Sequence, residues 1–159
     1  MRPAMSAPWM RGNSMGDIAA IMAGDNSMLR LSSYAIAERK FAQRAAPVYL
    51  YYFDWYSPVR GGKLRAMHGM ELPFVFGHPD LVQFMTGMGP ERYALAQRMS
   101  AAWVAFARTG NPNHGGIPQW SAWNPERWPT MLFGREVRSA DDPWGAERRA
   151  LAAARAAVR

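Results

Sequence analysis

Cysteine is absent from this chain, and lysine occurs only twice, at Lys40 and Lys63. Without cysteine there is no disulfide framework, no thiol nucleophile and no thiolate metal site. The chain also lacks an apolar run long enough to cross a bilayer, so no membrane span is expected. No continuous apolar segment follows the first residues, and we therefore expect no signal peptide. The compartment stays undetermined, with a cytoplasmic location favoured for the chain as it stands.

A basic block interleaved with regularly spaced aromatic residues is missing too. The net charge is +7, but arginines scattered along the sequence supply most of it. Such scatter indicates a solvated surface, so we expect no nucleic-acid partner. The 159 residues are 49% hydrophobic and 13% aromatic, which predicts a globular domain with a real core.

Residues 47–77 organise the rest of the chain. Residues 47–55 (PVYLYYFDW) are dense in aromatic and other apolar residues, which predicts a strand buried on both faces, as in parallel sheets. Pro58, Gly61 and Gly62 end this strand and open a loop. The loop presents His68, with Gly69 beside it.

A histidine on a loop after a buried strand can accept and return a proton near neutral pH. On placement alone this is a weak signal, because a lone histidine is more often a structural hydrogen-bonding residue. Glu71 and His78 follow it, but the spacing is not that of a zinc motif, and we expect no metal and no cofactor. Glu71 is interpreted as a hydrogen-bonding group near the histidine loop, or as a partner of Arg65 in a salt bridge.

Several motifs in order resemble those of one enzyme family. Residues 68–77 (HGMELPFVFG) are similar to the catalytic-histidine segment of the type B carboxylesterases, the group that includes the cholinesterases and para-nitrobenzyl-type esterases. Residues 47–55 resemble the strand before that histidine. Residues 103–113 (WVAFARTGNPN), 118–125 (PQWSAWNP) and 130–133 (TMLF) resemble the family's C-terminal signature.

The resemblance covers about residues 23–151 and implies an α/β fold, namely the C-terminal part of an α/β-hydrolase with an incomplete doubly wound sheet and flanking helices. It implies ester hydrolysis by a serine nucleophile, with His68 as the catalytic histidine. Residues 1–22 form a poorly defined N-terminal segment, and residues 23–159 form the hydrolase portion. The chain departs from the family in lacking a convincing nucleophile elbow and a glycine-rich oxyanion loop.

Two residues in the N-terminal segment are alternatives for the missing catalytic groups. Ser14 lies in a formal G-x-S-x-G match, but the preceding residues make a poor strand and Ser14 is too near His68 in sequence. Asp17 has a layout similar to that of the family's triad acid, again closer to His68 than in the family. The alternative interpretation, which the spacing favours, is a first-turn carboxylate of a short helix over residues 17–23.

The remaining pattern predicts helices and an aromatic loop. A helix is expected over residues 28–45, and the best helix runs between Gly89 and Gly110. Its stripe, which includes Trp103 and Phe106, is predicted to be core. The tryptophans of the following loop, Trp120, Trp123 and Trp128, are predicted to pack against the rest of the fold. Residues 131–133 are predicted to form a short edge strand, and residues 146–159 a peripheral helix.

Three functional hypotheses remain open. The chain is an esterase piece that needs the missing part of the fold, a non-catalytic remnant acting as an interaction module, or a small self-sufficient hydrolase that uses Ser14. Its expected partners are a small ester substrate and either a complementing N-terminal segment or a second copy of itself. Because the strand at residues 48–55 would expose apolar surface without its neighbours, the isolated chain is predicted to be partly disordered or self-associated. The sequence does not specify the substrate.

Overall fold

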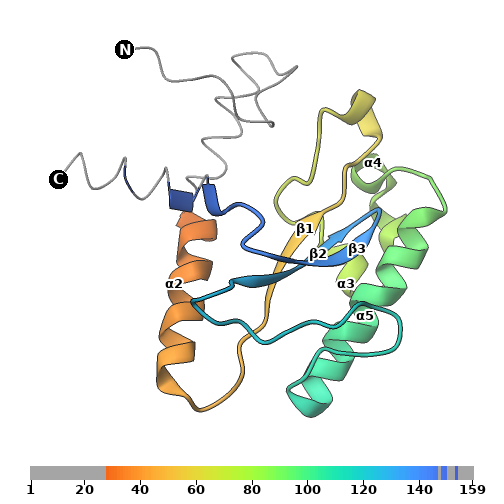
Figure 1. Ribbon diagram of the computed structural model, residues 1–159. Helices are drawn as coiled ribbons and strands as arrows, with labels where there is room; N and C mark the ends of the chain where they lie inside the picture. Colours follow the sequence, from red (N-terminus) through yellow and green to blue (C-terminus); the bar gives the residue numbers. More distant parts are fainter. Residues whose placement is uncertain (1–27, 147, 150–152, 154–159) are drawn as a thin grey trace, which may run out of the picture. The chain divides into compact units, whose positions relative to one another are not determined.

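The computed structural model describes residues 28–146, 148, 149 and 153 (Figure 1). The chain divides into two compact units, residues 1–36 with 146–159, and residues 37–145. The second unit holds the sheet and His68. Residues 1–22, with the candidate residues Ser14 and Asp17, and most of the predicted C-terminal helix lie outside the described residues.

A three-stranded mixed sheet lies at the centre of the second unit (Figure 1). Its strands are β1 (Leu50–Asp54), β2 (Pro129–Gly134) and β3 (Val137–Asp141), in the order β1-β2-β3. β1 and β2 run parallel, with Leu50 opposite Thr130, whereas β2 and β3 form an antiparallel hairpin. A parallel pair built from segments so far apart in sequence is typical of an α/β fold.

β2 is the middle strand of the described sheet, and every one of its residues is buried. The expectation that residues 131–133 form an edge strand is therefore wrong. The physical reason is β3, which sequence reasoning missed because its residues, VRSAD, carry little apolar character. Strand β3 pairs with the side of β2 that the sequence predicts to be open to solvent.

β1 is shorter and less buried than the sequence predicts. Residues 47–49 precede the strand, and its burial alternates between half-buried and exposed positions, with Tyr51 37% exposed. The prediction of burial on both faces is wrong for the described residues, because among them β1 has a neighbouring strand on one side only. The predicted exposure of this strand without its neighbours is confirmed.

The helices predicted over residues 28–45 and between Gly89 and Gly110 are present. α2 spans Met28–Gln43, and α5 spans Glu91–Thr109. Pro90 and Glu91 begin α5, and Gly110 ends it in the left-handed conformation that glycine adopts without strain. Between β1 and α5 lie η2 (Val59–Gly62), α3 (Leu72–Val75), η3 (Pro79–Val82) and α4 (Gln83–Thr86).

The core lies between the sheet and the helices α3 and α5, which pack against each other. Because residues alternate along a strand, Tyr51 and Phe53 of β1 share a face with Met131 and Phe133 of β2. That face meets the buried stripe of α5, and the principal core residues are Trp55, Met70, Phe74, Leu95, Met99, Ala102, Trp120, Met131 and Phe133. The opposite face carries Tyr52, whose ring lies 4.2 Å from that of Trp144.

The tryptophans of the connection between α5 and β2 pack into the fold, as the sequence predicts. Trp120 is 3% exposed and donates its indole hydrogen to the Leu50 carbonyl at 3.1 Å. The backbone amide of Trp123 donates to the Val48 carbonyl at 2.7 Å. This segment is therefore fixed to the start of β1.

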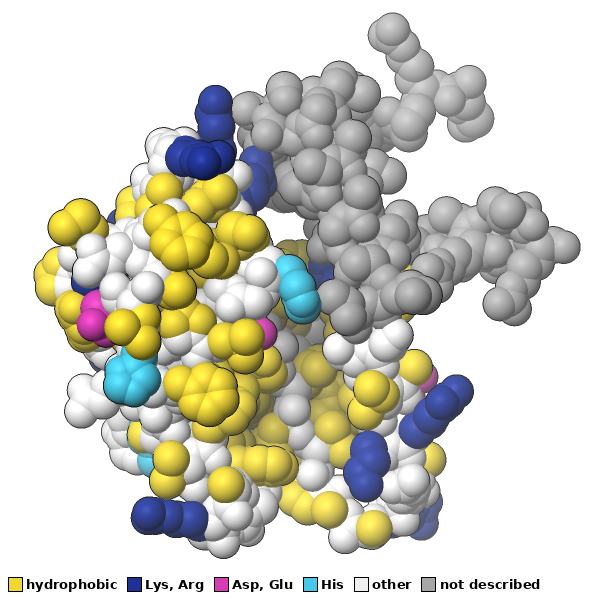
Figure 2. Space-filling model, turned by 180° about the vertical axis from the view of Figure 1, so that it is seen from behind, with side chains coloured by type: hydrophobic (Ala, Val, Ile, Leu, Met, Phe, Trp, Pro, Cys, Tyr) yellow, Lys and Arg dark blue, Asp and Glu magenta, His cyan; other side chains and the backbone are white. Residues whose placement is uncertain are grey.

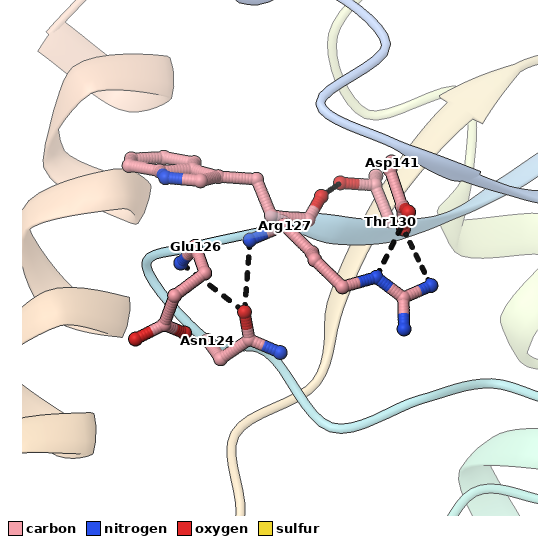
Figure 3. Close-up of polar contacts among 6 residues, drawn as sticks. Asn124, Glu126, Arg127, Thr130 and Asp141 are labelled. Carbon is pink, nitrogen blue, oxygen red and sulfur yellow. Dashed lines mark hydrogen bonds and ion pairs between the residues drawn. The ribbon is translucent and has the colours of Figure 1, made fainter.

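A polar turn leads from this segment into β2 (Figure 3). The Asn124 side-chain oxygen accepts hydrogen bonds from the backbone amides of Glu126 and Arg127. The Arg127 guanidinium reaches across to Asp141 of β3, with Nε 2.9 Å from Oδ2. Since both side chains are largely exposed, the pair adds at most about 1 kcal/mol.

Candidate active site

His68 begins a turn that leads into α3, directly after the loop that follows β1. Its side chain is exposed, and among the described residues its ring makes no hydrogen bond. Gly69 has φ +80°, and apart from its two chain neighbours no residue has an atom within 4 Å of where a β-carbon would be. The backbone beside His68 is thus open to an approaching group, and only glycine takes this conformation without strain.

The residues after His68 fix this turn to the core. Met70 and Phe74 are both fully buried. The Phe74 ring lies 5.2 Å from that of Phe53 and 5.3 Å from that of Trp55. The predicted anchoring role of residues 72–76 is confirmed for Phe74, whereas Leu72 and Phe76 are 52% and 70% exposed.

Hydrogen bonds also close the base of the loop that carries His68. The Ser57 hydroxyl, which is fully buried, donates to the Met85 carbonyl at 2.5 Å. The Trp55 indole donates to the Thr86 carbonyl at 3.1 Å. The Thr86 hydroxyl in turn donates to the Pro79 carbonyl at 2.7 Å. The first two bonds join the residues directly after β1 to α4 across residues 58–84, and the third ties α4 to the start of η3. We call the three bonds together the loop clamp.

Arg92 of α5 contacts the segment that directly follows α4. Its side chain is 3% exposed, and its guanidinium donates to the Gly87 carbonyl and, at 3.0 Å, to the Tyr93 hydroxyl. A buried cation held by a carbonyl fixes the segment that follows α4. Sequence reasoning missed Ser57, Thr86 and Arg92. The polar residues of the clamp lie in otherwise apolar surroundings, and that is the only signal the sequence offers.

Glu71 exerts its charge on Tyr51 of β1. Burial raises the pKa of the Tyr51 phenol above its ordinary value, and the nearby Glu71 carboxylate raises it further, because a second negative charge is unfavourable there. Burial likewise raises the pKa of the Asp54 carboxyl, and Arg138 partly offsets this effect. The expected hydrogen bond of Glu71 to the histidine loop stays a prediction.

The structure does not bring a full catalytic constellation together within the residues it describes. Ser14 and Asp17, the alternatives for nucleophile and acid, lie outside them. Among the described residues, no three His, Cys, Asp or Glu side chains are grouped as metal ligands would be. In the same part of the chain, no helix is both long and apolar enough to cross a bilayer.

An aromatic groove opens beside β1, on the face of the sheet that α5 covers. Its volume is about 210 Å³, and it is lined by Tyr49, Tyr51, Ala102, Trp103, Phe106, Pro112 and Trp120. The prediction that Trp103 and Phe106 are core is only partly right, since Trp103 is half-buried and Phe106 is 46% exposed. They pack on one side and line the groove on the other.

Apolar side chains are also exposed after the histidine turn. The largest exposures there are those of Phe76, Leu81, Phe84 and Met88, between 70% and 76%. Figure 2 shows hydrophobic side chains gathered over much of the face seen from behind. Four large apolar side chains within residues 76–88 are therefore mostly exposed to solvent.

The comparisons with known proteins agree on one family. The model of the carboxylesterase family matches residues 17–151. The chain is 34% identical to para-nitrobenzyl esterase of Bacillus subtilis over 119 residues, which are 74% of this chain and 24% of that protein. It is 32% identical to phenmedipham hydrolase of Pseudarthrobacter oxydans, over 79% of this chain and 26% of that protein.

Solved structures give the same result. A carboxylesterase of Geobacillus stearothermophilus matches with a TM-score of 0.56 and 43% identity, over 69% of this chain and 22% of that one. An esterase from Clostridium hathewayi, described as able to hydrolyse aliphatic aromatic polyesters, matches with a TM-score of 0.67 and 30% identity. The match covers 82% of this chain and 25% of the Clostridium esterase.

This chain therefore spans about a quarter of the relatives that it matches. Its mixed sheet with flanking helices is part of an α/β-hydrolase fold. By its motifs, its fold and its relatives, the chain belongs to the carboxylesterase family.

Proposed function

We propose that this chain is the portion of a serine carboxylic ester hydrolase that supplies the catalytic histidine, His68. One observation carries the proposal: His68 projects, exposed, from a turn that the core and the loop clamp both hold, immediately after β1. A proton-transfer group must be held within a fraction of an ångström of its productive position. Membership of the carboxylesterase family supports the assignment to ester hydrolysis.

In the proposed reaction, His68 takes the proton of a serine hydroxyl as that oxygen attacks the ester carbonyl. The same ring then delivers the proton to the alcohol as it leaves, and activates the water that cleaves the acyl-enzyme. A triad acid would orient the ring, and backbone amides would stabilise the oxyanion. We assign the serine, the acid and the oxyanion donors to parts of the fold outside the described residues.

The proposed substrate class is a small carboxylic ester. The relatives carry names that refer to different substrates, such as para-nitrobenzyl esters and phenmedipham. The proposal therefore specifies a carboxylic ester bond in the substrate and does not specify the acyl or alcohol group. The corresponding partner is a complementing segment that carries the rest of the carboxylesterase fold, because the chain spans about a quarter of its relatives.

A second candidate is a non-catalytic remnant that acts as an interaction module. The exposed apolar side chains of Leu81, Phe84 and Met88, each at least 70% exposed, favour it because they indicate a surface that is covered by something. In that case His68 would be dispensable for binding.

Complementation in solution tests the proposed function. The partner is Bacillus subtilis para-nitrobenzyl esterase without the segment similar to this chain, which we call the complementary fragment. Hydrolysis of p-nitrophenyl acetate is measured with the complementary fragment and, in turn, the unsubstituted chain, His68→Ala and His78→Ala. We expect activity that falls at least about a hundredfold with His68→Ala, since general acid–base catalysis contributes that much. His78 is also exposed and serves as the matched control. Equal activity with all three chains would refute the role of His68.

A further inference from the structure

Arg92 is a buried cation that no acidic side chain neutralises. It lies in the first turn of α5 and is 3% exposed. Within the part of the chain that the structure describes, no carboxylate pairs with it, and its Nε has no hydrogen-bond partner. The guanidinium carbon lies 4.8 Å from the centre of the Tyr93 ring, which offsets part of the cost of burial. An unpaired buried charge still lowers stability, so the stability of the fold does not explain why an arginine stands here.

The guanidinium binds the backbone at Gly87, where the loop that carries His68 closes. Its Nη1 donates a hydrogen bond to the Gly87 carbonyl, and its Nη2 donates to the Tyr93 hydroxyl at 3.0 Å. Gly87 directly follows α4 and packs against the ring of Pro58 at the other end of the loop. A β-carbon added to Gly87 would lie 2.5 Å from Pro58 Cγ. Arg92 is therefore bonded to the point at which the two ends of residues 58–87 meet.

The backbone of Gly87 leaves its carbonyl as the group by which this junction can be held. With φ 85° and ψ −173°, Gly87 has a conformation that essentially only glycine adopts, and it has no side chain to bind a neighbour. Arg92 supplies the donor from α5. Leu95 and Met99 of the same helix lie in the core, so the hydrogen bond ties the junction to a packed element.

A short series of contacts connects Gly87 to the histidine turn. Thr86 precedes Gly87, and its carbonyl accepts the hydrogen bond of the Trp55 indole at 3.1 Å. The Trp55 ring lies 5.3 Å from that of Phe74, the buried residue that anchors the turn. Close-packed groups of this kind transmit a displacement to their neighbours. A shift of Gly87 would therefore reach the turn from which His68 projects.

We propose that Arg92 is a positioning residue for His68. Its hydrogen bond to Gly87 fixes both ends of the loop on α5 and so keeps the histidine turn in its catalytic position. The inference rests on the proposed function for the role of His68, but not for the hold of Arg92 on the loop. A misplacement of a reacting group by about 1 Å costs about a hundredfold in rate, so a residue that lowers stability is retained where it prevents one.

Three substitutions on α5 separate positioning from a merely structural role. Arg92→Met fills similar space without a charge or a donor. Because it removes an uncompensated buried charge, it should leave the melting temperature within about 2 °C of that of the unsubstituted chain, or raise it. Arg92→Lys keeps one donor for the Gly87 carbonyl. Arg98→Met makes the same change at an exposed position of the same helix and is the matched control.

Hydrogen–deuterium exchange of the chain alone measures the hold on the loop. In Arg92→Met, exchange over residues 58–84 should rise at least about fivefold, because the Gly87 carbonyl loses its partner, whereas exchange around Met99 should change little. Arg98→Met should leave both regions unchanged. An unchanged loop in Arg92→Met, or an equal rise along the whole chain, would overturn the proposal.

The effect on catalysis is measured in a chimera in which the chain replaces the similar segment of Bacillus subtilis para-nitrobenzyl esterase. With p-nitrophenyl acetate, Arg92→Met should lower kcat at least about tenfold and change KM less than about threefold, and Arg92→Lys should recover most of the loss. Full activity of Arg92→Met, a melting temperature that falls in parallel with its activity, or no recovery with Arg92→Lys would overturn the proposal.

Failure of this inference and failure of the proposed function give different results. Hydrolysis that depends on His68 but is unchanged by Arg92→Met would remove the role of Arg92 and keep the proposed function. A chimera without His68-dependent hydrolysis, combined with faster exchange confined to residues 58–84 in Arg92→Met, would remove the proposed function and support the hold of Arg92 on the loop.

Discussion

Ser57→Ala tests whether the loop clamp holds the histidine turn in place. The Ser57 side chain is fully buried and its hydroxyl donates to the Met85 carbonyl at 2.5 Å. The same oxygen accepts a hydrogen bond from the Val59 amide at 3.2 Å. Alanine keeps the packing but leaves both backbone groups without this partner. An unsatisfied buried polar group costs about 1–3 kcal/mol.

This cost should fall on the loop and not on the whole unit. If it is confined to opening of residues 58–84, the amide hydrogen-exchange rates there should rise by about 5- to 150-fold, the equivalent of 1–3 kcal/mol at 25 °C. Exchange in the buried half of α5 should change little. The measurement is hydrogen–deuterium exchange followed by mass spectrometry, at a pH where exchange reports opening equilibria.

The control is Ser139→Ala, at an exposed position on β3, which should leave exchange in the loop unchanged. An equal rise in exchange across residues 58–84 and α5 would mean that Ser57 stabilises the fold generally. Unchanged exchange in the loop would refute the clamp outright.

Two further predictions concern the core and the β1 edge. Phe74→Ala removes a fully buried ring that contacts Phe53 and Trp55, and it should lower the free energy of unfolding, measured by urea titration, by about 3–5 kcal/mol. The control Leu72→Ala, at a 52% exposed position, should change this free energy by less than about 0.5 kcal/mol. Equal effects of the two substitutions would contradict the assigned packing. The raised pKa of Tyr51 means that the folded state holds this proton more tightly than the unfolded state, so its stabilising effect is complete below the ordinary pKa of 10.0 and is lost as pH rises above it. Tyrosine ionisation is followed by absorbance in an alkaline titration of the unsubstituted chain and of Tyr51→Phe. The difference between the two curves should show a phenol that ionises above pH 10.0. Ionisation at or below pH 10.0 would contradict the prediction.

The sequence predicts best those features that local chemistry determines. The ends of α5 follow from Pro90 and Gly110, whose backbone preferences start and stop helices whatever their surroundings. The assignment of the catalytic role to His68 from the family motif stays a prediction, whereas the buried Phe74 confirms the apolar anchor expected after it. These signals lie within a few residues of the feature that they specify.

Features that depend on distant partners could not be predicted. β2 was expected at an edge because nothing in its own residues reveals that β3 covers its far side. The burial of β1 was overestimated because a strand's composition reports the neighbours it is suited to, not those it has. The Ser57 hydrogen bond to Met85 spans 28 residues of sequence, and no local pattern encodes it. The triad could not be assembled, since Ser14 and Asp17 lie outside the described residues.

The most direct test of the account uses a chimera in which this chain replaces the similar segment of Bacillus subtilis para-nitrobenzyl esterase. In this single polypeptide the chain supplies the histidine, and hydrolysis of p-nitrophenyl acetate is measured. We expect the chimera to be active, to lose at least about a hundredfold in kcat/KM with His68→Ala, and to keep its activity with His78→Ala. Circular dichroism should show all three proteins to be folded. A folded His68→Ala chimera that is as active as the unsubstituted one would contradict the central claim, because the catalytic proton would then be carried by another residue.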